Sequence, residues 1–373
     1  MATAPLAGTE HHPHAAAVLG AALPPRGRPS HAYLFGGPAG AGKRTAARAF
    51  AAALLVEGAP EPDAVRGRVE RGSHPDLTWV TPSGAHELLV GDIDAAVVGA
   101  AARTPFEARR RVFVIERADT MIEQAANKML KTLEEPPPFA HLILLSDRPG
   151  EVLPTIASRC QHVRFEALPE DEVVARLGRE GVEPKPARAA ARLARGDARL
   201  ARELATGDGP KLRVAAQRFA RAAPAAEMGE RPWRELLAQA RGRAEAAAAE
   251  LDQQHAATLE LTAKRDRRRA DTEHAERSRR LARRVHTETL DLQLALVGLW
   301  YRDLLCVALD TPDLAANVDR EAELATDAAG RDPTALRRAL ELVDDTRQRL
   351  PLNVTEELAC EALGYRLERL LAA

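Results

Sequence analysis

A glycine-rich turn that follows a short apolar run constrains this sequence more than any other feature. Residues 37–43 read Gly-Pro-Ala-Gly-Ala-Gly-Lys and match the phosphate-loop pattern G-x-x-x-x-G-K. Ala32–Phe35 before the turn is a candidate buried strand, and Arg44–Leu55 after it is a candidate helix. A loop of this kind between a strand and a helix predicts backbone N–H groups and Lys43 around a phosphate group.

Strand and helix signals continue to alternate as far as Phe165. Short apolar runs predict further strands, and amphipathic or alanine-rich stretches predict helices between them. The strands are expected at 77–80, 112–115, 142–145 and 162–165, and the helices at 12–23, 93–104 and 123–135. This alternation predicts an α/β domain over residues 1–165, with a parallel sheet covered on both faces.

Strand signals stop after Phe165, and the rest of the chain is expected to be helical. Residues 166–207 predict a small helical lid domain, because glycine and proline break that stretch into short pieces. Residues 208–373 predict an all-α C-terminal domain. Trp233 to Thr311 contains no proline and is rich in strong helix formers, so long charged helices are expected over about residues 233–300. They would form one continuous helix or an antiparallel pair.

The charge of the chain argues against a generally basic nucleic-acid binder, since the formal net charge is −1. Residues 264–284 depart from this balance, with ten Lys or Arg against four Asp or Glu. This run has two readings: a solvated helix face, or a surface that binds DNA or an acidic partner.

The cysteines and the apolar segments indicate the cellular compartment that such a chain would occupy. The three cysteines lie far apart, which predicts neither a disulfide framework nor a paired metal site and fits a reducing cytoplasm. No signal peptide and no long uninterrupted apolar run is read, so membrane association is not expected.

The phosphate loop departs from its pattern at the residue after Lys43. Position 44 is Arg, where a Ser or Thr hydroxyl would hold Mg²⁺, and Thr45 would point about 100° away around the helix. Nucleotide binding could survive this change, but correct magnesium placement is not expected. The glycine-rich turn could also bind nothing. The candidate nucleotide-binding residues here are Gly37, Gly40, Gly42, Lys43, Arg44 and Thr45.

The strand at 112–115 ends in Glu116-Arg117-Ala118-Asp119. P-loop hydrolases of this class end the equivalent strand with two adjacent carboxylates, one near the metal and one that prepares water. A cation at the second position cannot be a general base, so Arg117 argues against hydrolysis. Glu116 stays a nucleotide-side candidate, with a turn and helix cap as the alternative reading.

Four segments occur in a fixed order along the chain: 37–43, 112–119, Lys131-Thr132-Leu133-Glu134-Glu135-Pro136-Pro137 and Ser158-Arg159-Cys160. Together they resemble the bacterial DNA polymerase III clamp-loader subunits, which are AAA+ ATPases. The resemblance covers residues 12–205 and is diffuse beyond them. Arg44 and Arg117 make the chain similar to the delta-prime kind of subunit rather than to the gamma/tau motor.

This resemblance implies a role for Ser158 and Arg159. In the family, the arginine of the Ser-Arg-Cys motif acts in trans on ATP bound by a neighbouring gamma/tau subunit. A guanidinium supplied in this way neutralises charge that builds up on the γ-phosphate and is worth roughly 10³–10⁵ in rate. The alternative reading of Arg159 is an ordinary surface arginine.

The resemblance also implies a place for the whole chain. It would be a clamp-loader stator in the cytoplasmic replisome that helps to open the sliding clamp and load it on primed DNA. Its partners would be the gamma/tau and delta subunits, and through the complex the beta clamp and primer–template DNA. It would belong to the polymerase holoenzyme, a nucleotidyltransferase, without a polymerase active site. The alternative is an ATP-hydrolysing gamma/tau-like motor or another P-loop ATPase; a generic DNA-binding helical protein would leave the motifs unexplained.

Two further residues are implied by the family. Ser146 follows the fourth strand, where a polar sensor sits near the γ-phosphate, although a strand-ending turn explains it equally well. Arg199, in Gly196-Asp197-Ala198-Arg199, resembles a lid arginine that contacts nucleotide, or is a helix-surface arginine. Relatives often carry four zinc-binding cysteines after the first helix of the sheet domain. No cysteine lies between Val56 and Leu77, so zinc is not expected.

Overall fold

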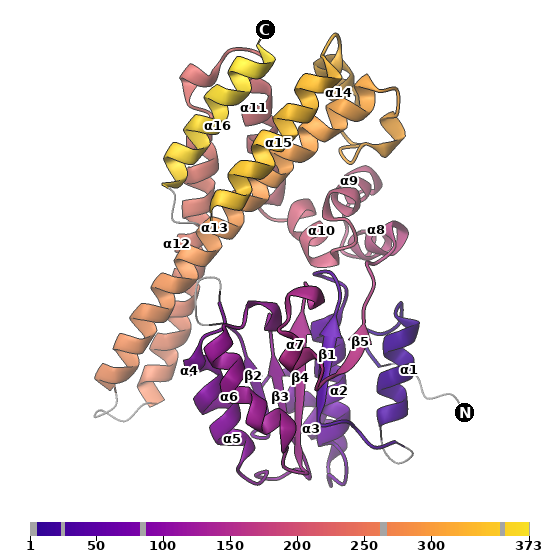
Figure 1. Cartoon of the computed structure of the whole chain (residues 1–373), viewed down its shortest axis with the longest axis vertical. Coiled ribbons are helices and arrows are strands. Elements are labelled where there is room, and N and C mark those ends of the chain that lie inside the picture. The colour runs from indigo at the N-terminus through magenta and orange to yellow at the C-terminus, as the bar shows by residue number, and fades with distance from the viewer. Residues whose placement is uncertain (1–5, 24–26, 83–86, 262–266, 351–354, 373) are drawn as a thin grey trace. The chain divides into compact units, whose positions relative to one another are not determined.

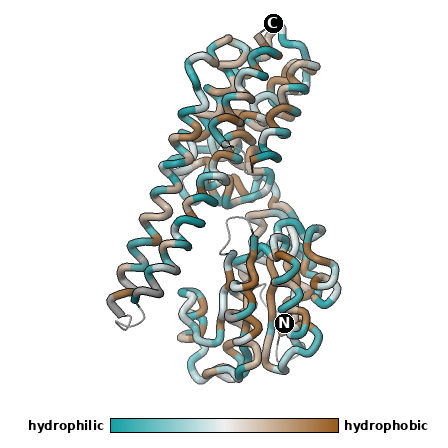
Figure 2. The backbone as a smooth tube through the Cα atoms, turned by 60° about the vertical axis from the view of Figure 1, so that its left-hand side comes forward, coloured by the Kyte–Doolittle hydropathy of each residue, from teal (hydrophilic) through white to brown (hydrophobic). Residues whose placement is uncertain are grey.

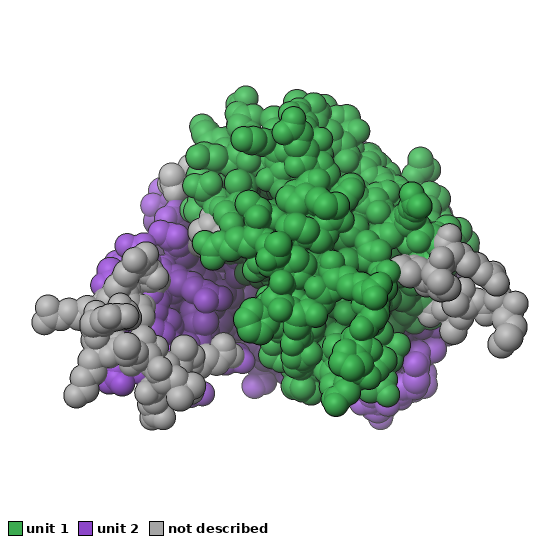
Figure 3. Space-filling model, turned by 90° about the horizontal axis from the view of Figure 1, so that it is seen from below, with its two compact units in different colours: residues 1–168 green, residues 169–373 purple. Residues whose placement is uncertain are grey.

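The computed structural model describes residues 6–23, 27–82, 87–261, 267–350 and 355–372. The chain divides into two compact units, residues 1–168 and 169–373, called here the first and second units (Figure 3). The finer division into 1–165, 166–207 and 208–373 stays a prediction.

The first unit is built on a five-stranded parallel sheet (Figure 1). The strand order is β2-β3-β4-β1-β5, and each pair of neighbours is parallel. Every residue of β4 is buried, as expected for a strand covered on both faces. The strands predicted from the sequence are confirmed to within two residues: β1 (Ala32–Gly36), β2 (Leu77–Val80), β3 (Arg111–Ile115), β4 (Ala140–Ser146) and β5 (Gln161–Arg164).

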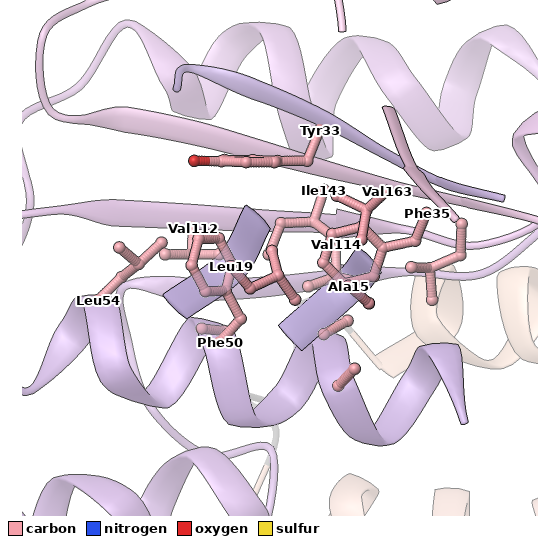
Figure 4. Close-up of a cluster of buried hydrophobic side chains, with 14 of the residues drawn as sticks. Ala15, Leu19, Tyr33, Phe35, Phe50, Leu54, Val112, Val114, Ile143 and Val163 are labelled. Carbon is pink, nitrogen blue, oxygen red and sulfur yellow. The ribbon is translucent and has the colours of Figure 1, made fainter. Parts of the chain in front are cut away.

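Alternate residues of the strands face two separate hydrophobic layers. On one face, Tyr33 and Phe35 pack with Leu19 of α1 and Phe50 of α2 (Figure 4). On the other face, Leu34 belongs to the layer formed by the helices that follow β2 and β3. This period of two is what a pleated strand requires. The helices of the first layer are α1 (Pro13–Ala22), α2 (Lys43–Leu55) and α3 (Pro62–Glu70).

The second layer contains the helical segment that was predicted at 93–104. The prediction of a single helix at 93–104 is wrong in its bounds. The helical segment begins with α4 (Val90–Ile93), widens into a π-helical turn (Asp94–Val98) and ends with α5 (Gly99–Ala101). Asp92 fixes the earlier start, because its Oδ2 accepts a hydrogen bond from the backbone N–H of Leu89 at 2.8 Å. The other helices of this layer are α6 (Glu123–Glu134) and α7 (Pro154–Ala157).

Helix α3 was not predicted. It offers only Val65 and Val69 to the hydrophobic layer, four residues apart in a charged stretch. Two apolar residues give too weak a periodic signal to be read, and tertiary packing against α2 completes the helix.

The second unit contains only helices among its described residues. Three short helices pack together at its start: α8 (Glu170–Arg179), α9 (Pro184–Ala194) and α10 (Ala198–Ala205). Helix α13 then packs against α11, α12, α14 and α15. The bounds are α11 (Gly209–Ala222), α12 (Trp233–Leu261), α13 (Arg267–Ala308), α14 (Glu321–Ala328), α15 (Pro333–Arg349) and α16 (Glu356–Leu371).

The proline-free stretch forms the two long helices α12 and α13, which run antiparallel. Gln293 donates a hydrogen bond to Gln239 at 2.8 Å, and the rings of His255 and His274 stack with centroids 3.9 Å apart. Residue numbers therefore rise along one helix as they fall along the other. Both helices carry brown, apolar segments where they meet the rest of the second unit (Figure 2). None of the helices in the described part of the chain has the length and apolar character needed to cross a lipid bilayer.

Candidate functional site

The phosphate loop lies between β1 and α2, where the sequence predicts it. Gly40 and Gly42 have φ values of 68° and 95°, a left-handed conformation that glycine adopts without a steric penalty. Gly37 is needed for a different reason, because a Cβ there would lie 2.0 Å from the carbonyl oxygen of Phe165. The loop therefore has the backbone of a phosphate loop and is braced against the end of β5.

The ammonium group of Lys43 already binds three groups within the first unit. Its side chain is 5% exposed, and its Nζ donates hydrogen bonds to the carbonyl oxygens of Gly37 (2.5 Å) and Pro38 (2.6 Å). The same Nζ lies 2.7 Å from Oδ1 of Asp147, just after β4. A phosphate group would have to displace this carboxylate to reach Lys43. No local sequence pattern predicts the pairing of Asp147 with Lys43.

Arg44 and Glu116 form the second ion pair of the site. Arg44 Nε lies 2.9 Å from Glu116 Oε1, which also accepts a hydrogen bond from Trp79 Nε1 at 2.5 Å. The Arg48 guanidinium lies over the Trp79 ring, 4.9 Å from its centroid. Arginine therefore occupies the position of the magnesium-binding hydroxyl and neutralises the acid at the end of β3. These residues do not fit Mg²⁺, because the site already holds its own cation.

Ser146 and Asp119 meet at the same edge of the sheet. The Ser146 hydroxyl donates a hydrogen bond to Asp119 Oδ1 at 2.9 Å, and Arg148 Nη2 lies 3.4 Å from Asp119 Oδ2. Thr45 is exposed at the start of α2. The residues predicted around the loop are thus brought together at the carboxyl ends of β1, β3 and β4, but most of their charges are paired with one another.

His12 is a residue of this region that the sequence did not single out, since it appeared only as the first residue of the helix predicted at 12–23. Its side chain is buried, and burial lowers its pKa. Nδ1 accepts a hydrogen bond from the backbone N–H of Glu166 at 3.2 Å, so the neutral ring carries its proton on Nε2 and donates it to the carbonyl of Ala41 at 2.6 Å. His12 therefore ties the start of α1 to the phosphate loop.

Arg159 lies between α7 and β5 and is 36% exposed. Its Nη2 donates to Glu134 Oε1 at 2.6 Å, and its Nη1 donates to the carbonyl of Thr155 at 3.0 Å. Ser158 is exposed beside it, whereas Cys160 is buried and burial raises the pKa of its thiol to about 12. Of the three motif residues, Cys160 anchors the turn in the core and the other two face solvent. Glu134 is a second residue whose role the sequence did not indicate.

The strand register places Arg159 at the other end of the sheet from the phosphate loop. Gln161 pairs with Tyr33 at the start of β1, while the loop follows Gly36 at the end of the same strand. Because β1 and β5 are parallel, the turn before β5 and the loop after β1 are separated by the length of the strands, about 13 Å for four residues. This exceeds the reach of an arginine side chain, so Arg159 does not serve its own loop.

Arg199 belongs to the second unit. Asp197 caps α10 by accepting a hydrogen bond from the N–H of Leu200 at 2.9 Å, so the helix begins one residue before Arg199. The Arg199 side chain is 72% exposed and lies 4.0 Å from Glu203. This long, exposed contact leaves the guanidinium accessible.

The segment that follows α2 is held by packing and by hydrogen bonds. His74 is buried 3.0 Å from Glu107, and burial lowers the pKa of its imidazole. Asp76 accepts hydrogen bonds from three consecutive backbone N–H groups, of Phe106, Glu107 and Ala108. Within the residues that the structure describes, no group of three or more His, Cys, Asp or Glu is arranged to hold a metal ion.

Comparison with known proteins shows that the first unit is similar to subunits of DNA polymerase III. Residues 12–169 match the family described as DNA polymerase III, delta subunit. The DNA polymerase III subunit delta' of Bacillus subtilis (strain 168) is 38% identical over 165 residues, 43% of this chain and 50% of that protein. The delta' subunit of Pseudomonas aeruginosa is 38% identical over 141 residues, 36% of this chain and 43% of that protein.

A gamma/tau subunit is similar over nearly the same share of the chain. The DNA polymerase III subunit gamma/tau of Mycobacterium tuberculosis (strain H37Rv) is 34% identical over 176 residues, 44% of this chain and 29% of that protein. The chain thus spans half or less of the length of each of these relatives. Residues 12–169, with their five-stranded parallel sheet and phosphate loop, are therefore delta-prime-like: they are similar to DNA polymerase III subunits over less than half of the chain.

Proposed function

We propose that this chain is a clamp-loader stator of the delta-prime type, which donates Arg159 to ATP held by a neighbouring gamma/tau subunit. The observation that carries the proposal is the separation of Arg159 from its own phosphate loop along the parallel strands β1 and β5. A guanidinium that is exposed, held in place and out of reach of its own loop is suited to a nucleotide on another subunit.

The contacts of Arg159 favour this use. Arginine stays protonated at any physiological pH and carries five N–H donors in a planar fork. Glu134 and Thr155 engage one face of this fork, which orients the group while leaving further donors for a phosphate oxygen. Charge developing on the γ-phosphate in the transition state would attract the guanidinium more strongly than the half-exposed Glu134 carboxylate does.

The chain's own loop argues against hydrolysis at this subunit. Asp147 neutralises Lys43, and Arg44 neutralises Glu116, so neither the phosphate-binding cation nor the metal-side acid is available without rearrangement. Arg117 stands where a second acid would prepare water. ATP bound at residues 37–45 would have to displace Asp147 from Lys43.

The proposed partners and location are supported by the relatives, which are named as subunits of DNA polymerase III. On this basis the chain assembles with gamma/tau and delta subunits and acts on the sliding clamp and primer–template DNA through the complex, in the cytoplasmic replisome. Residues 166–207 would serve as the lid and residues 208–373 as the collar that holds the subunits together.

The test is Arg159→Ala in a loader reconstituted with gamma/tau and delta subunits. We expect the complex to assemble normally by size-exclusion chromatography but to lose hydrolysis at the adjoining ATP site, by roughly 10³-fold or more at that site in single turnover. Arg71→Ala is the matched control, since Arg71 is also an exposed arginine of the first unit. Unchanged hydrolysis in the Arg159→Ala complex would contradict the proposal.

A second candidate, an ATP-hydrolysing gamma/tau-like motor or another P-loop ATPase, is supported by the 34% identity to a gamma/tau subunit. It predicts that the purified chain hydrolyses ATP alone and that Lys43→Ala abolishes this turnover. The stator proposal expects no such turnover, so steady-state ATP hydrolysis by the isolated chain separates the two.

A further inference from the structure

The second unit carries a two-helix arm, defined here as residues 245–261 of α12 and 267–285 of α13. Two residues next to the arm contact other parts of the unit. Arg243 pairs with Glu203 and Asp208, and His286 pairs with Glu356. Figure 1 shows the arm extending beyond α11, α15 and α16. Among the described side chains of the arm, the ion pairs and the ring contact that join different helices link α12 to α13.

A pair of histidines fixes how the two helices of the arm face each other. The His255 and His274 rings are nearly parallel, at 3°, with centroids 3.9 Å apart. Each pairs with an aspartate on the opposite helix: His255 with Asp271 at 3.0 Å and His274 with Asp252 at 2.6 Å. This crossed arrangement sets the register, so the face that α13 turns to solvent is defined.

Charge is segregated between the exposed faces of the two helices. On α13 the exposed positions from 275 to 283 are mostly arginine, and the one acid among them, Glu276, pairs with Arg280 at 3.0 Å. On α12 the exposed positions from 245 to 253 carry no cation, and their charged residues are Glu245, Glu250 and Asp252. Surfaces that serve only solubility mix the two signs, whereas this arm concentrates positive charge on one side.

We propose that the exposed row Arg277, Arg279, Arg280 and Arg283 binds the phosphate backbone of duplex DNA without reading its sequence. Arginine forks match phosphate oxygens, and residues 277 to 283 span about 9 Å of helix, comparable to about three phosphates of one strand at a rise of about 3.4 Å each. The exposed positions from 275 to 283 include no aromatic or large apolar residue, which a protein partner would be expected to bury, and no Asn or Gln to read base edges. The proposal rests on the second unit alone and does not depend on the role of Arg159.

The experiment measures binding of the full chain to a fluorescein-labelled 30-base-pair duplex by anisotropy, from 50 to 200 mM NaCl. The test variant is Arg277→Gln/Arg279→Gln/Arg280→Gln. We expect the slope of log K against log salt to fall by about three, since each phosphate contact contributes about 0.9, with affinity at 100 mM salt down at least tenfold. Two duplexes of unrelated sequence should bind the wild-type chain equally.

The control is Arg234→Gln/Arg337→Gln/Arg338→Gln, which removes the same charge from exposed positions of the same unit. It should bind DNA within about twofold of the wild type, and circular dichroism should show equal helix content in all three proteins. The proposal is overturned if the wild type does not bind at 50 mM salt, or if control and test variants lose affinity equally. Poly-L-glutamate of matched charge is the competitor; if it displaces the duplex at equal charge concentration, the arm is a site for an acidic protein instead.

Discussion

At the scale of single residues, Arg44 changes what the phosphate loop can hold. It removes the hydroxyl that would bind Mg²⁺ and at the same time places a guanidinium 2.9 Å from Glu116. Glu116 is 14% exposed and needs a counterion, because a partly buried carboxylate without one pays a desolvation cost. The presence of Arg44 therefore removes the magnesium-binding hydroxyl and also stabilises the Glu116 carboxylate.

Replacing Arg44 tests this account. Arg44→Ala should lower the free energy of unfolding of the first unit by about 1 kcal/mol, because the pair is only partly buried and solvent screens it. Adding Glu116→Gln should recover most of this loss, because the amide oxygen still accepts the Trp79 hydrogen bond without carrying a charge. Urea unfolding followed by Trp79 fluorescence, in a Trp233→Phe/Trp300→Phe background, gives the measurement. Additive losses in the double variant would show that the two side chains are not coupled.

The Ser158-Arg159-Cys160 motif does not contain the residue that orients its arginine. The resemblance to clamp-loader subunits implied an arginine that acts on a neighbouring subunit. The partner that orients it, Glu134, lies twenty-five residues away along the chain, at the end of α6. Only the packing of α6 beside α7 brings this carboxylate to the guanidinium.

At the scale of elements, the phosphate loop is braced by two close backbone approaches. Gly37 lies against the carbonyl of Phe165, and Gly8, with φ 85°, lies against the first turn of α2. Neither approach leaves room for a Cβ atom. The loop is thus held by the end of β5 on one side and by the N-terminal segment on the other.

Gly37→Ala should be strongly destabilising for this reason. A Cβ would lie 2.0 Å from a backbone oxygen, so β1 or β5 must move, and a cost of about 3 kcal/mol or more is expected. Gly91→Ala is the matched control, since nothing lies within 4 Å of the added Cβ in α4 and alanine favours a helix by up to about 1 kcal/mol. Urea midpoints of the two variants should move in opposite directions; a neutral Gly37→Ala would contradict the close approach.

At the scale of the whole molecule, the first unit should lose stability in mild acid. Burial lowers the pKa values of His12, His74 and His141, the last to about 4. His141 Nδ1 donates to the carbonyl of Ser30 at 2.9 Å, and its Nε2 accepts from Arg110 at 2.9 Å, so both contacts suit the neutral ring. Below the ordinary histidine pKa of 6.5, the unfolded chain binds more protons than the folded unit.

The stability that these histidines provide is therefore intact above about pH 6.5 and is lost as the pH falls toward 4. His141 alone should account for up to about 3 kcal/mol of this loss, because one pKa unit corresponds to about 1.4 kcal/mol. Amide hydrogen exchange in β1 and β4 at pH 7 and pH 4.5 measures it. In His141→Gln the pH dependence should flatten, whereas the exposed control His162→Gln should keep it; an unchanged slope in both would rule out His141 as its source.

Much of the first unit could be predicted because its signals are local. Each strand is an apolar run bounded by polar residues, and the loop motif marks the junction of β1 and α2. Helix α3 and the π-helical turn could not be predicted, since their stability comes from packing against α2 and from the cap at Asp92. The pairings of Lys43 with Asp147 and of Arg44 with Glu116 join residues far apart in sequence, and no local pattern indicates them.

By itself, the sequence determined the α/β sheet domain, the helical remainder and the identities of the candidate residues, because hydrophobic periodicity and turn chemistry act over a few neighbouring positions. Tertiary structure alone decided which charges neutralise one another around the loop, and that Arg159 stands at the far end of parallel strands from it. It also decided that the exposed arginines between residues 277 and 283 lie on the solvent-facing side of α13 in a paired arm. These outcomes depend on strand register and helix packing, which bring distant segments together and are not encoded in any short stretch of chain.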